Sequence, residues 1–277
     1  MAESALYTEN KKSFNKAVRM AETMTTRYGI AGMTGVVLTS TTILFSSASG
    51  LVWAQNTSAL EVGKFSAAPE GAALPDGWKP LTFAKIPKQT QYEIIKEGGR
   101  PVVKAISDAS ASGLTKDIKI DPKEFPVVRW QWKVENLLAT SDATRKDGDD
   151  YPARLYITFE YDPGKVSVGK KLKYKAGRVL FGDIPIGAIN YVWERKAPIG
   201  AVIDNAYTDF VKMVVVESGP QKLGMWIDEE RNIYEDYKKA FGEEPPMING
   251  VAIMSDTDNT KERAIAYYGD ITFVKGR

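Results

Sequence analysis

Residues 127–134 read Val-Val-Arg-Trp-Gln-Trp-Lys-Val, an alternation of apolar and polar side chains that begins at Val128. Successive side chains of a β-strand point to opposite faces of its sheet. One face of this stretch therefore carries Arg129, Gln131 and Lys133, and the other carries Val128, Trp130, Trp132 and Val134. The pattern predicts a half-buried strand whose two tryptophans lie in a hydrophobic core.

Similar short runs, separated by Gly, Pro and Asp, continue in both directions from this stretch. They predict eleven further strands: Leu60–Ser66, Trp78–Ala84, Tyr92–Ile95, Val102–Ser107, Thr115–Ile120, Ala153–Tyr161, Arg178–Phe181, Ile189–Trp193, Phe210–Glu217, Gly250–Asp256 and Ile265–Val274. Gly98-Gly99 is typical of a hairpin turn between two of them. So many strands with few helices predict an all-β fold, a two-sheet sandwich of the jelly-roll, galactose-binding-like kind.

One segment, Asp228–Phe241, predicts the single α-helix of this domain. Asp228 can cap its N-terminus, acidic residues follow it, and two lysines precede Gly242, which ends the helix. Ile233, Tyr237 and Phe241 recur every four residues. The helix should therefore lay an apolar stripe on the sandwich.

The N-terminal region has the order of an export signal. Five basic residues between Lys11 and Arg27 precede a stretch that has no charged residue until Glu61, and its centre is mostly apolar. Two cleavage sites fit, after Ala48 and after Ala54, and we favour the second. We expect residues 1–54 to be a signal peptide or membrane anchor helix, and residues 55–277 to be a single β-sandwich domain. If the segment is not cleaved, residues 28–54 are long enough to cross a membrane.

Composition excludes several functions. The chain has no cysteine and no histidine, which removes disulfides, thiol nucleophiles, Ser-His-Asp catalysis and most zinc, copper and haem sites. Residues 1–54 hold five Lys or Arg and three Asp or Glu, so the remainder is neutral and lacks the basic surface that nucleic acid requires. Nucleotide-binding, dinucleotide-binding and esterase motifs are also absent. Any chemistry must use carboxylates, Lys, Tyr or Arg.

Two acidic loops, 147–150 and 256–260, stand at the ends of predicted strands. Calcium binds six to eight oxygen ligands and needs no histidine, so the loops are candidates for a structural calcium site. Its candidate ligands are Asp147, Asp149, Asp256, Asp258 and Asn259. Neither loop has EF-hand spacing. The alternative is that Asp and Asn serve only as turn formers.

Polar residues inside predicted strands and the predicted helix supply the candidate binding residues. Arg154, Tyr156, Thr158 and Glu160 form the polar row of one strand, which is either solvated sheet surface or the floor of a binding groove. The candidate ligand-binding residues are Asp149, Asp150, Arg154, Tyr156, Asn190, Trp193 and Arg231. An internal ion-pair network is the alternative for several of them. No catalytic residue can be assigned.

Five segments together resemble a bacterial family, the domain of unknown function 3047. They are residues 147–157, residues 190–193, Glu217-Ser218-Gly219, the segment 231–242, and residues 256–260 followed by 267–271. The resemblance runs from about Leu60 to the C-terminus. It implies an exported bacterial protein with a sandwich related to galactose-binding and other carbohydrate-binding modules. The polar positions that the resemblance shares are Asp149, Asp150, Arg154, Asn190, Trp193, Arg231, Asp256, Asp258 and Asn259.

The leading functional hypothesis is a non-catalytic binding module of the cell envelope, periplasmic or secreted, whose partner is a glycan or another polar envelope ligand. Tyrosine and tryptophan beside planar polar groups suit sugars. The first alternative is a carboxylate-based glycoside hydrolase or lyase, in which Glu217 would act with an aspartate of the acidic loops. The second is a structural or assembly subunit that binds an envelope protein. Nucleic acid is not an expected partner.

Overall fold

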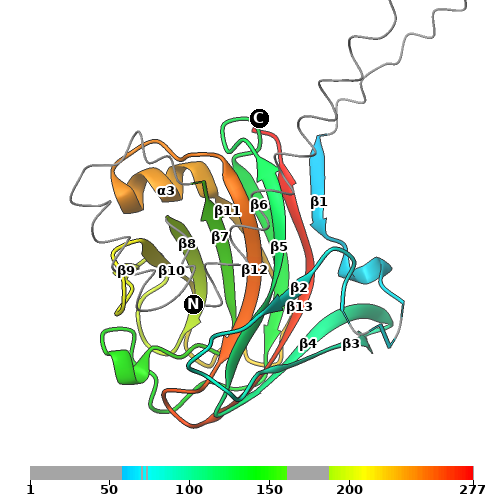
Figure 1. Ribbon diagram of the computed structural model, residues 1–277, viewed down its shortest axis with the longest axis vertical. Coiled ribbons are helices and arrows are strands. Elements are labelled where there is room, and N and C mark those ends of the chain that lie inside the picture. The colour runs from blue at the N-terminus through cyan, green and yellow to red at the C-terminus, as the bar shows by residue number, and fades with distance from the viewer. Residues whose placement is uncertain (1–57, 70, 73, 161–186, 277) are drawn as a thin grey trace, which may run out of the picture. The chain divides into compact units, whose positions relative to one another are not determined.

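Two β-sheets pack face to face in the computed structural model, which describes residues 58–69, 71–72, 74–160 and 187–276 (Figure 1). The predicted signal segment, its cleavage sites and the predicted strand Arg178–Phe181 lie outside the described residues. The six-stranded sheet has the order β11-β6-β13-β4-β3, and β1 also pairs with β13. Its strands are β1 (Ala59–Gly63), β3 (Gln91–Glu97), β4 (Arg100–Asp108), β6 (Val127–Val134), β11 (Ile227–Asn232) and β13 (Arg263–Val274).

The seven-stranded sheet has the order β2-β5-β12-β7-β8-β10-β9. Its strands are β2 (Lys79–Leu81), β5 (Ala111–Ile120), β7 (Arg154–Phe159), β8 (Ala188–Glu194), β9 (Val202–Asp204), β10 (Val211–Ser218) and β12 (Ile248–Asp256). Neighbouring strands in the described residues are antiparallel, except that β8 and β10 are parallel. Two short 3₁₀ turns, η1 (Phe65–Ala67) and η2 (Lys146–Gly148), lie in the connections. The prediction of an all-β, two-sheet sandwich with one helix is confirmed for this part of the chain.

The core lies between the sheets, and β6 contributes the apolar face that its alternation predicts. Val128, Trp130, Trp132 and Val134 are each at most 2% exposed. Trp130 stacks on Tyr191 of the opposite sheet, with ring centroids 5.1 Å apart, and Trp132 lies 6.1 Å from Trp193. Burial of such side chains contributes on the order of 1.5–3 kcal/mol each.

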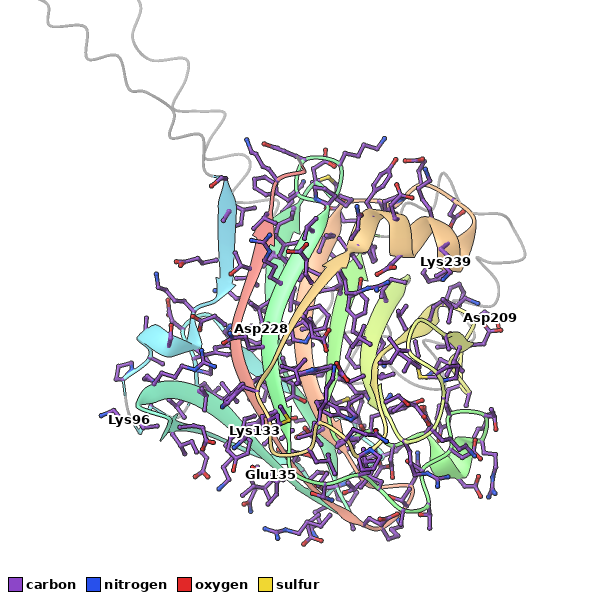
Figure 2. All side chains as sticks on the ribbon, turned by 180° about the vertical axis from the view of Figure 1, so that it is seen from behind. Lys96, Lys133, Glu135, Asp209, Asp228 and Lys239 are labelled. Atoms are coloured by element: carbon purple, nitrogen blue, oxygen red, sulfur yellow. The ribbon has the colours of Figure 1, made fainter. Side chains whose placement is uncertain are left out.

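The polar face of β6 departs from the prediction at one residue. Lys133 is 7% exposed, because Glu97 and Glu135 pair with its ammonium group and Tyr267 lies beneath it at 4.2 Å (Figure 2). Arg129, by contrast, is exposed and pairs with Glu230.

The predicted Gly98-Gly99 turn is confirmed. It joins β3 to β4, Glu97 pairs with Arg100, and the two glycines have φ angles of 59° and 85°. Two consecutive positive φ angles define the type I′ hairpin turn, which glycine adopts without a steric penalty.

The α-helix, α3 (Ile233–Phe241), begins five residues later than predicted. Asn232, not Asp228, caps it by accepting a hydrogen bond from the amide of Glu235 at 3.0 Å. Asp228 lies on β11, whose side chains are alternately half-buried and exposed along its pairing with β6 (Figure 2). Six residues of strand pairing outweighed the charge pattern that suggested a helix start.

The apolar stripe of α3 packs as predicted. Ile233 and Tyr237 are buried, and the Tyr237 ring lies 4.5 Å from that of Phe159, the last residue of β7. The place of α3 in the fold can be seen in Figure 1. Gly242 ends the helix in the left-handed conformation, with φ 71°. None of the described helices has the length and hydropathy needed to span a bilayer.

Two short strands, β9 and β11, have no counterpart among the predicted strands, and β5 begins at Ala111 instead of Thr115. Three residues are too few to show an alternation in β9, and Ala111-Ser112-Gly113 lacks the bulky residues that indicate a strand. Strands β9 and β11 and the start of β5 are determined by pairing with neighbouring strands, and the local sequence does not show that pairing.

Candidate functional site

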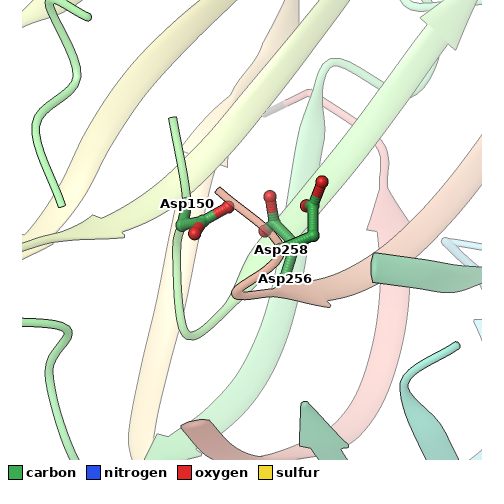
Figure 3. Close-up of side chains that lie close together, drawn as sticks. All are labelled: Asp150, Asp256 and Asp258. Atoms are coloured by element: carbon green, nitrogen blue, oxygen red, sulfur yellow. The ribbon is translucent and has the colours of Figure 1, made fainter. Parts of the chain in front are cut away.

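The two acidic loops meet at one end of two central strands of the seven-stranded sheet, where β7 begins and β12 ends. These strands are antiparallel neighbours with Met254 opposite Arg154, so the loop before β7 lies beside the loop after β12. Asp150 and Asp256 are 1% and 3% exposed, and Asp258 is half-buried. One carboxylate oxygen from each lies within 4.8 Å of the other two (Figure 3). We call these three residues, with Asp149, the acidic centre.

Arg154 is the cation of the acidic centre, and it is 3% exposed. Its Nε donates to Asp256 Oδ1 at 2.7 Å, and its Nη2 donates to Asp256 Oδ2 and, at 2.7 Å, to the carbonyl oxygen of Asp149. Such a bidentate pair fixes the guanidinium plane. Its Nη1 donates to the hydroxyl of Tyr156 at 3.2 Å. Arg154 therefore connects the acidic centre to the outer face of the sheet.

Burial makes negative charge costly at this centre. Burial, together with the nearby carboxylates of Asp150 and Asp149, raises the pKa of Asp256 to about 8 against the opposing effect of Arg154. Burial likewise raises the pKa values of Asp149 and Asp258, and the carboxylate of Asp150 adds to both shifts. Carboxylates that crowd in a desolvated site disfavour one another's ionised forms.

Hydrogen bonds join the two loops. Asp150 accepts from the backbone amides of Asn259 at 3.3 Å and Thr260 at 2.6 Å. Asn259 Nδ2 donates to the carbonyl oxygen of Asp149 at 3.4 Å. Two buried oxygens nearby, Asp149 Oδ1 and Thr260 Oγ1, have no hydrogen-bond partner. Asp149, Asp150, Asp256, Asp258 and these two oxygens are the groups that could hold a cation.

A row of side chains crosses the outer face of the same sheet at one level. Strand register places Thr115, Ala252, Tyr156, Asn190 and Met213 side by side, on β5, β12, β7, β8 and β10. Tyr156 is half-buried. Asn190 is 0% exposed, and neither its Oδ1 nor its Nδ2 has a hydrogen-bond partner. A buried amide without partners costs free energy and requires an explanation. We call Arg154, Tyr156 and Asn190 the polar strip.

The structure therefore brings five candidate ligand-binding residues together: Asp149, Asp150, Arg154, Tyr156 and Asn190. It places Trp193 on the opposite face of β8, fully buried, where its Nε1 donates to the carbonyl oxygen of Gly219. Arg231 lies near the end of β11 and pairs with Asp236 of α3, which also accepts from Tyr191.

The candidate metal ligands divide in the same way. Asp256 and Asp258 belong to the acidic centre with Asp149, and Asn259 supports it through its backbone amide and its side-chain amide. Asp147 is exposed and pairs with Arg145. The predicted partner of a catalytic aspartate, Glu217, pairs with Lys222.

Sequence reasoning missed several residues of this site. Asn205 donates to Asp149 Oδ2 at 3.3 Å, the backbone amide of Tyr151 donates to Asp256 Oδ1 at 3.3 Å, and the hydroxyl of Tyr268 accepts from the amide of Arg154 at 3.3 Å. Thr260 lies in the acidic loop 256–260, so the sequence pattern could have identified it as a site residue. Asn205 and Tyr268 carried no local signal, because only the fold brings them near Arg154.

A second group with a shifted pKa, Glu229 on β11, lies away from the acidic centre. Its titration should make the free energy of unfolding depend on pH. Burial, together with the nearby carboxylate of Glu217, raises its pKa from 4.5 to about 7, although Trp132 Nε1 donates to it at 3.2 Å. The folded state then binds more protons than the unfolded state between those pH values. We expect the free energy of unfolding to fall by on the order of 1–3 kcal/mol as pH rises from about 4.5 to 7.

Replacing Glu229 with Gln keeps its shape and removes this titration. Denaturant unfolding of E229Q between pH 4.5 and 8 should show a flatter profile than the wild-type protein and higher stability at pH 8. E230Q, which changes the exposed neighbour on the same strand, should leave the profile unaltered. A wild-type slope retained in E229Q would contradict this assignment.

The fold and the polar strip define the class: a β-sandwich protein with a largely buried row of polar side chains on the outer side of one sheet. The chain belongs to the family described as protein of unknown function DUF3047, whose model matches residues 76–272. This confirms the resemblance found in the sequence. A comparison with curated proteins finds no match.

Solved structures with a similar fold include two carbohydrate-binding modules from Clostridium thermocellum. The family 11 module of cellulosomal cellulase Lic26A-Cel5E has 8% identity and a TM-score of 0.38, over 79% of this chain and 95% of that one. The family 30 module of Cel9D-Cel44B has 10% identity and a TM-score of 0.34, over 78% and 98%. The glycoside hydrolase domain of Endo-D from Streptococcus pneumoniae R6 has 11% identity and a TM-score of 0.31, over 72% and 22%. These are distant similarities of fold.

Proposed function

We propose that this protein is a non-catalytic binding module for a glycan of the bacterial cell envelope, and that the ligand binds along the polar strip. The proposal includes export, with residues 1–54 as the signal or anchor that delivers the domain to the periplasm or beyond. The ligand lies on the outer face of the seven-stranded sheet, over Tyr156 and beside Arg154.

The observation that carries the proposal is the amide of Asn190, buried without a partner for either of its polar atoms. An amide offers two donors and a carbonyl acceptor in one plane. Sugar hydroxyls, each both donor and acceptor, can satisfy both ends of it at once. Selection for stability alone favours an apolar residue at such a position, because an unpaired buried amide costs about 1–3 kcal/mol.

The neighbouring residues suit the same class of ligand. Tyr156 stands next to Asn190 in register and is half-buried, so it keeps some exposed surface, and an aromatic ring suits the apolar face of a sugar. Its hydroxyl is already held by Arg154 at 3.2 Å, which fixes the ring before a ligand arrives. In this proposal a ligand first contacts Tyr156, and Asn190 becomes accessible when the side chains above it move.

We expect the full-length protein to bind at least one class of envelope polysaccharide in a glycan array, and Tyr156→Ala to weaken that binding about tenfold or more. The matched control is Tyr267→Ala, since Tyr267 is a half-buried tyrosine on the other sheet. Incubation should release no shortened product. The proposal fails if no envelope glycan binds, if the two alanine variants lose affinity equally, or if the glycan is cleaved.

A further inference from the structure

The acidic centre has the spacing of a cation site. One oxygen each from Asp150, Asp256 and Asp258 lies within 4.8 Å of the other two (Figure 3). Oxygens that surround a cation at roughly 2.3–2.6 Å lie no farther apart than about twice that length. The three carboxylates could therefore contact one ion without a large rearrangement of the backbone.

An independent observation also indicates a ligand here. Asp149 is 5% exposed and its Oδ1 accepts no hydrogen bond. Its contact with Arg154 Nη1 is 3.6 Å, longer than a hydrogen bond. The guanidinium of Arg154 is already bound to Asp256, so this buried oxygen beside Asp150 is left without a hydrogen-bond donor. Thr260 Oγ1 is a second buried oxygen without a partner, on the residue whose amide donates to Asp150.

When its carboxylates are ionised, the acidic centre carries more negative than positive charge. The buried members of the centre are three carboxylates, on Asp149, Asp150 and Asp256, against the single guanidinium of Arg154. A buried charge without a partner is strongly unfavourable. A divalent cation would balance the two negative charges that remain, and the half-buried Asp258 would face it from the solvent side.

We propose that the acidic centre binds one calcium ion, and that the ion fastens the loop before β7 to the loop after β12. The candidate ligand atoms of the acidic centre are all oxygens, which suits calcium or magnesium and not a soft metal. Calcium accepts six to eight ligands in flexible geometry, as two irregular loops supply, whereas magnesium demands a near-ideal octahedron. The calcium proposal does not rest on the glycan proposal, and each can be correct without the other.

The test uses the full-length protein stripped of metal with a chelator. Calcium titrated by calorimetry should bind with a stoichiometry of one, and a roughly 100-fold excess over Kd should raise Tm by roughly 5–10 °C. Magnesium at the same concentration should give a markedly smaller shift. Asp258→Asn removes one charged ligand from the half-buried side and should weaken calcium binding by at least about tenfold while the stripped protein remains folded.

The matched control is Asp147→Asn, an exposed carboxylate in the same loop that pairs with Arg145. It should bind calcium as the wild-type protein does. Three results would overturn the proposal: no calcium-dependent change in Tm or heat, equal loss of affinity in D147N and D258N, or wild-type affinity in D258N. Asp150→Asn provides a second variant with the same prediction if D258N proves unfolded.

Discussion

Replacing Arg154 with Met is expected to lower the free energy of unfolding by about 3–5 kcal/mol in the presence of a chelator. Arg154 is 3% exposed, and its guanidinium faces three buried carboxylates of the acidic centre. Its loss leaves Asp256 without its bidentate partner and removes the hydrogen bonds to Asp149 and Tyr156. Methionine fills much of the space, so the expected loss reflects uncompensated charge more than a cavity.

Denaturant unfolding of R154M and the wild-type protein measures this effect. The control is Arg129→Met, which removes an arginine that donates to Glu230 at 2.6 Å but lies on the exposed face of β6. Exposed pairs contribute at most about 1 kcal/mol, so R129M should change stability little. If R154M and R129M lose similar amounts, Arg154 does not hold the acidic centre together.

The same variant also bears on binding. Arg154 fixes the hydroxyl of Tyr156, so its loss should release the ring that we propose contacts the glycan. One residue thus connects the stability of the loops to the geometry of the polar strip. That connection gives Arg154 a role that an apolar residue, although less costly to bury, could not fill.

Alternation along single strands predicted the core well. Trp130 and Trp132 lie inside the sandwich because their positions on β6 have the same parity as Val128 and Val134, and parity is a local property of the chain. The same argument failed for Asp228. Its charges fit a helix start, but pairing with β6, far away in the sequence, made the segment a strand.

The candidate site was predictable only in part for the same reason. The polar residues of loops 147–150 and 256–260 were visible as two separate groups. Their convergence on Arg154 depends on the antiparallel pairing of β7 with β12, across about a hundred residues. Trp193 shows the opposite case, since its strand was predicted but its side chain belongs to the core face. The isolation of the Asn190 amide could not be read from sequence, because absence of a partner is a property of the whole packed structure.

Asn190→Val is expected to raise the free energy of unfolding by about 1–3 kcal/mol and to abolish glycan binding. Both amide atoms of Asn190 are buried without partners, so an apolar, β-branched residue removes their desolvation cost and suits the strand. A residue that makes the protein less stable than a simple apolar replacement would is expected at a binding site. It is not expected at a position that serves only the fold.

The control is Asn136→Val. Asn136 Nδ2 donates to the carbonyl oxygen of Arg263 at 2.7 Å, and its Oδ1 accepts from the amide of Ile265 at 3.3 Å. Losing these bonds should lower the free energy of unfolding by about 1–2 kcal/mol. Opposite signs for the two variants in denaturant unfolding, with glycan affinity lost only in N190V, would identify Asn190 as a binding residue. If N190V is destabilised as N136V is, the Asn190 amide serves the fold, and the polar strip loses the feature that marks it as a site.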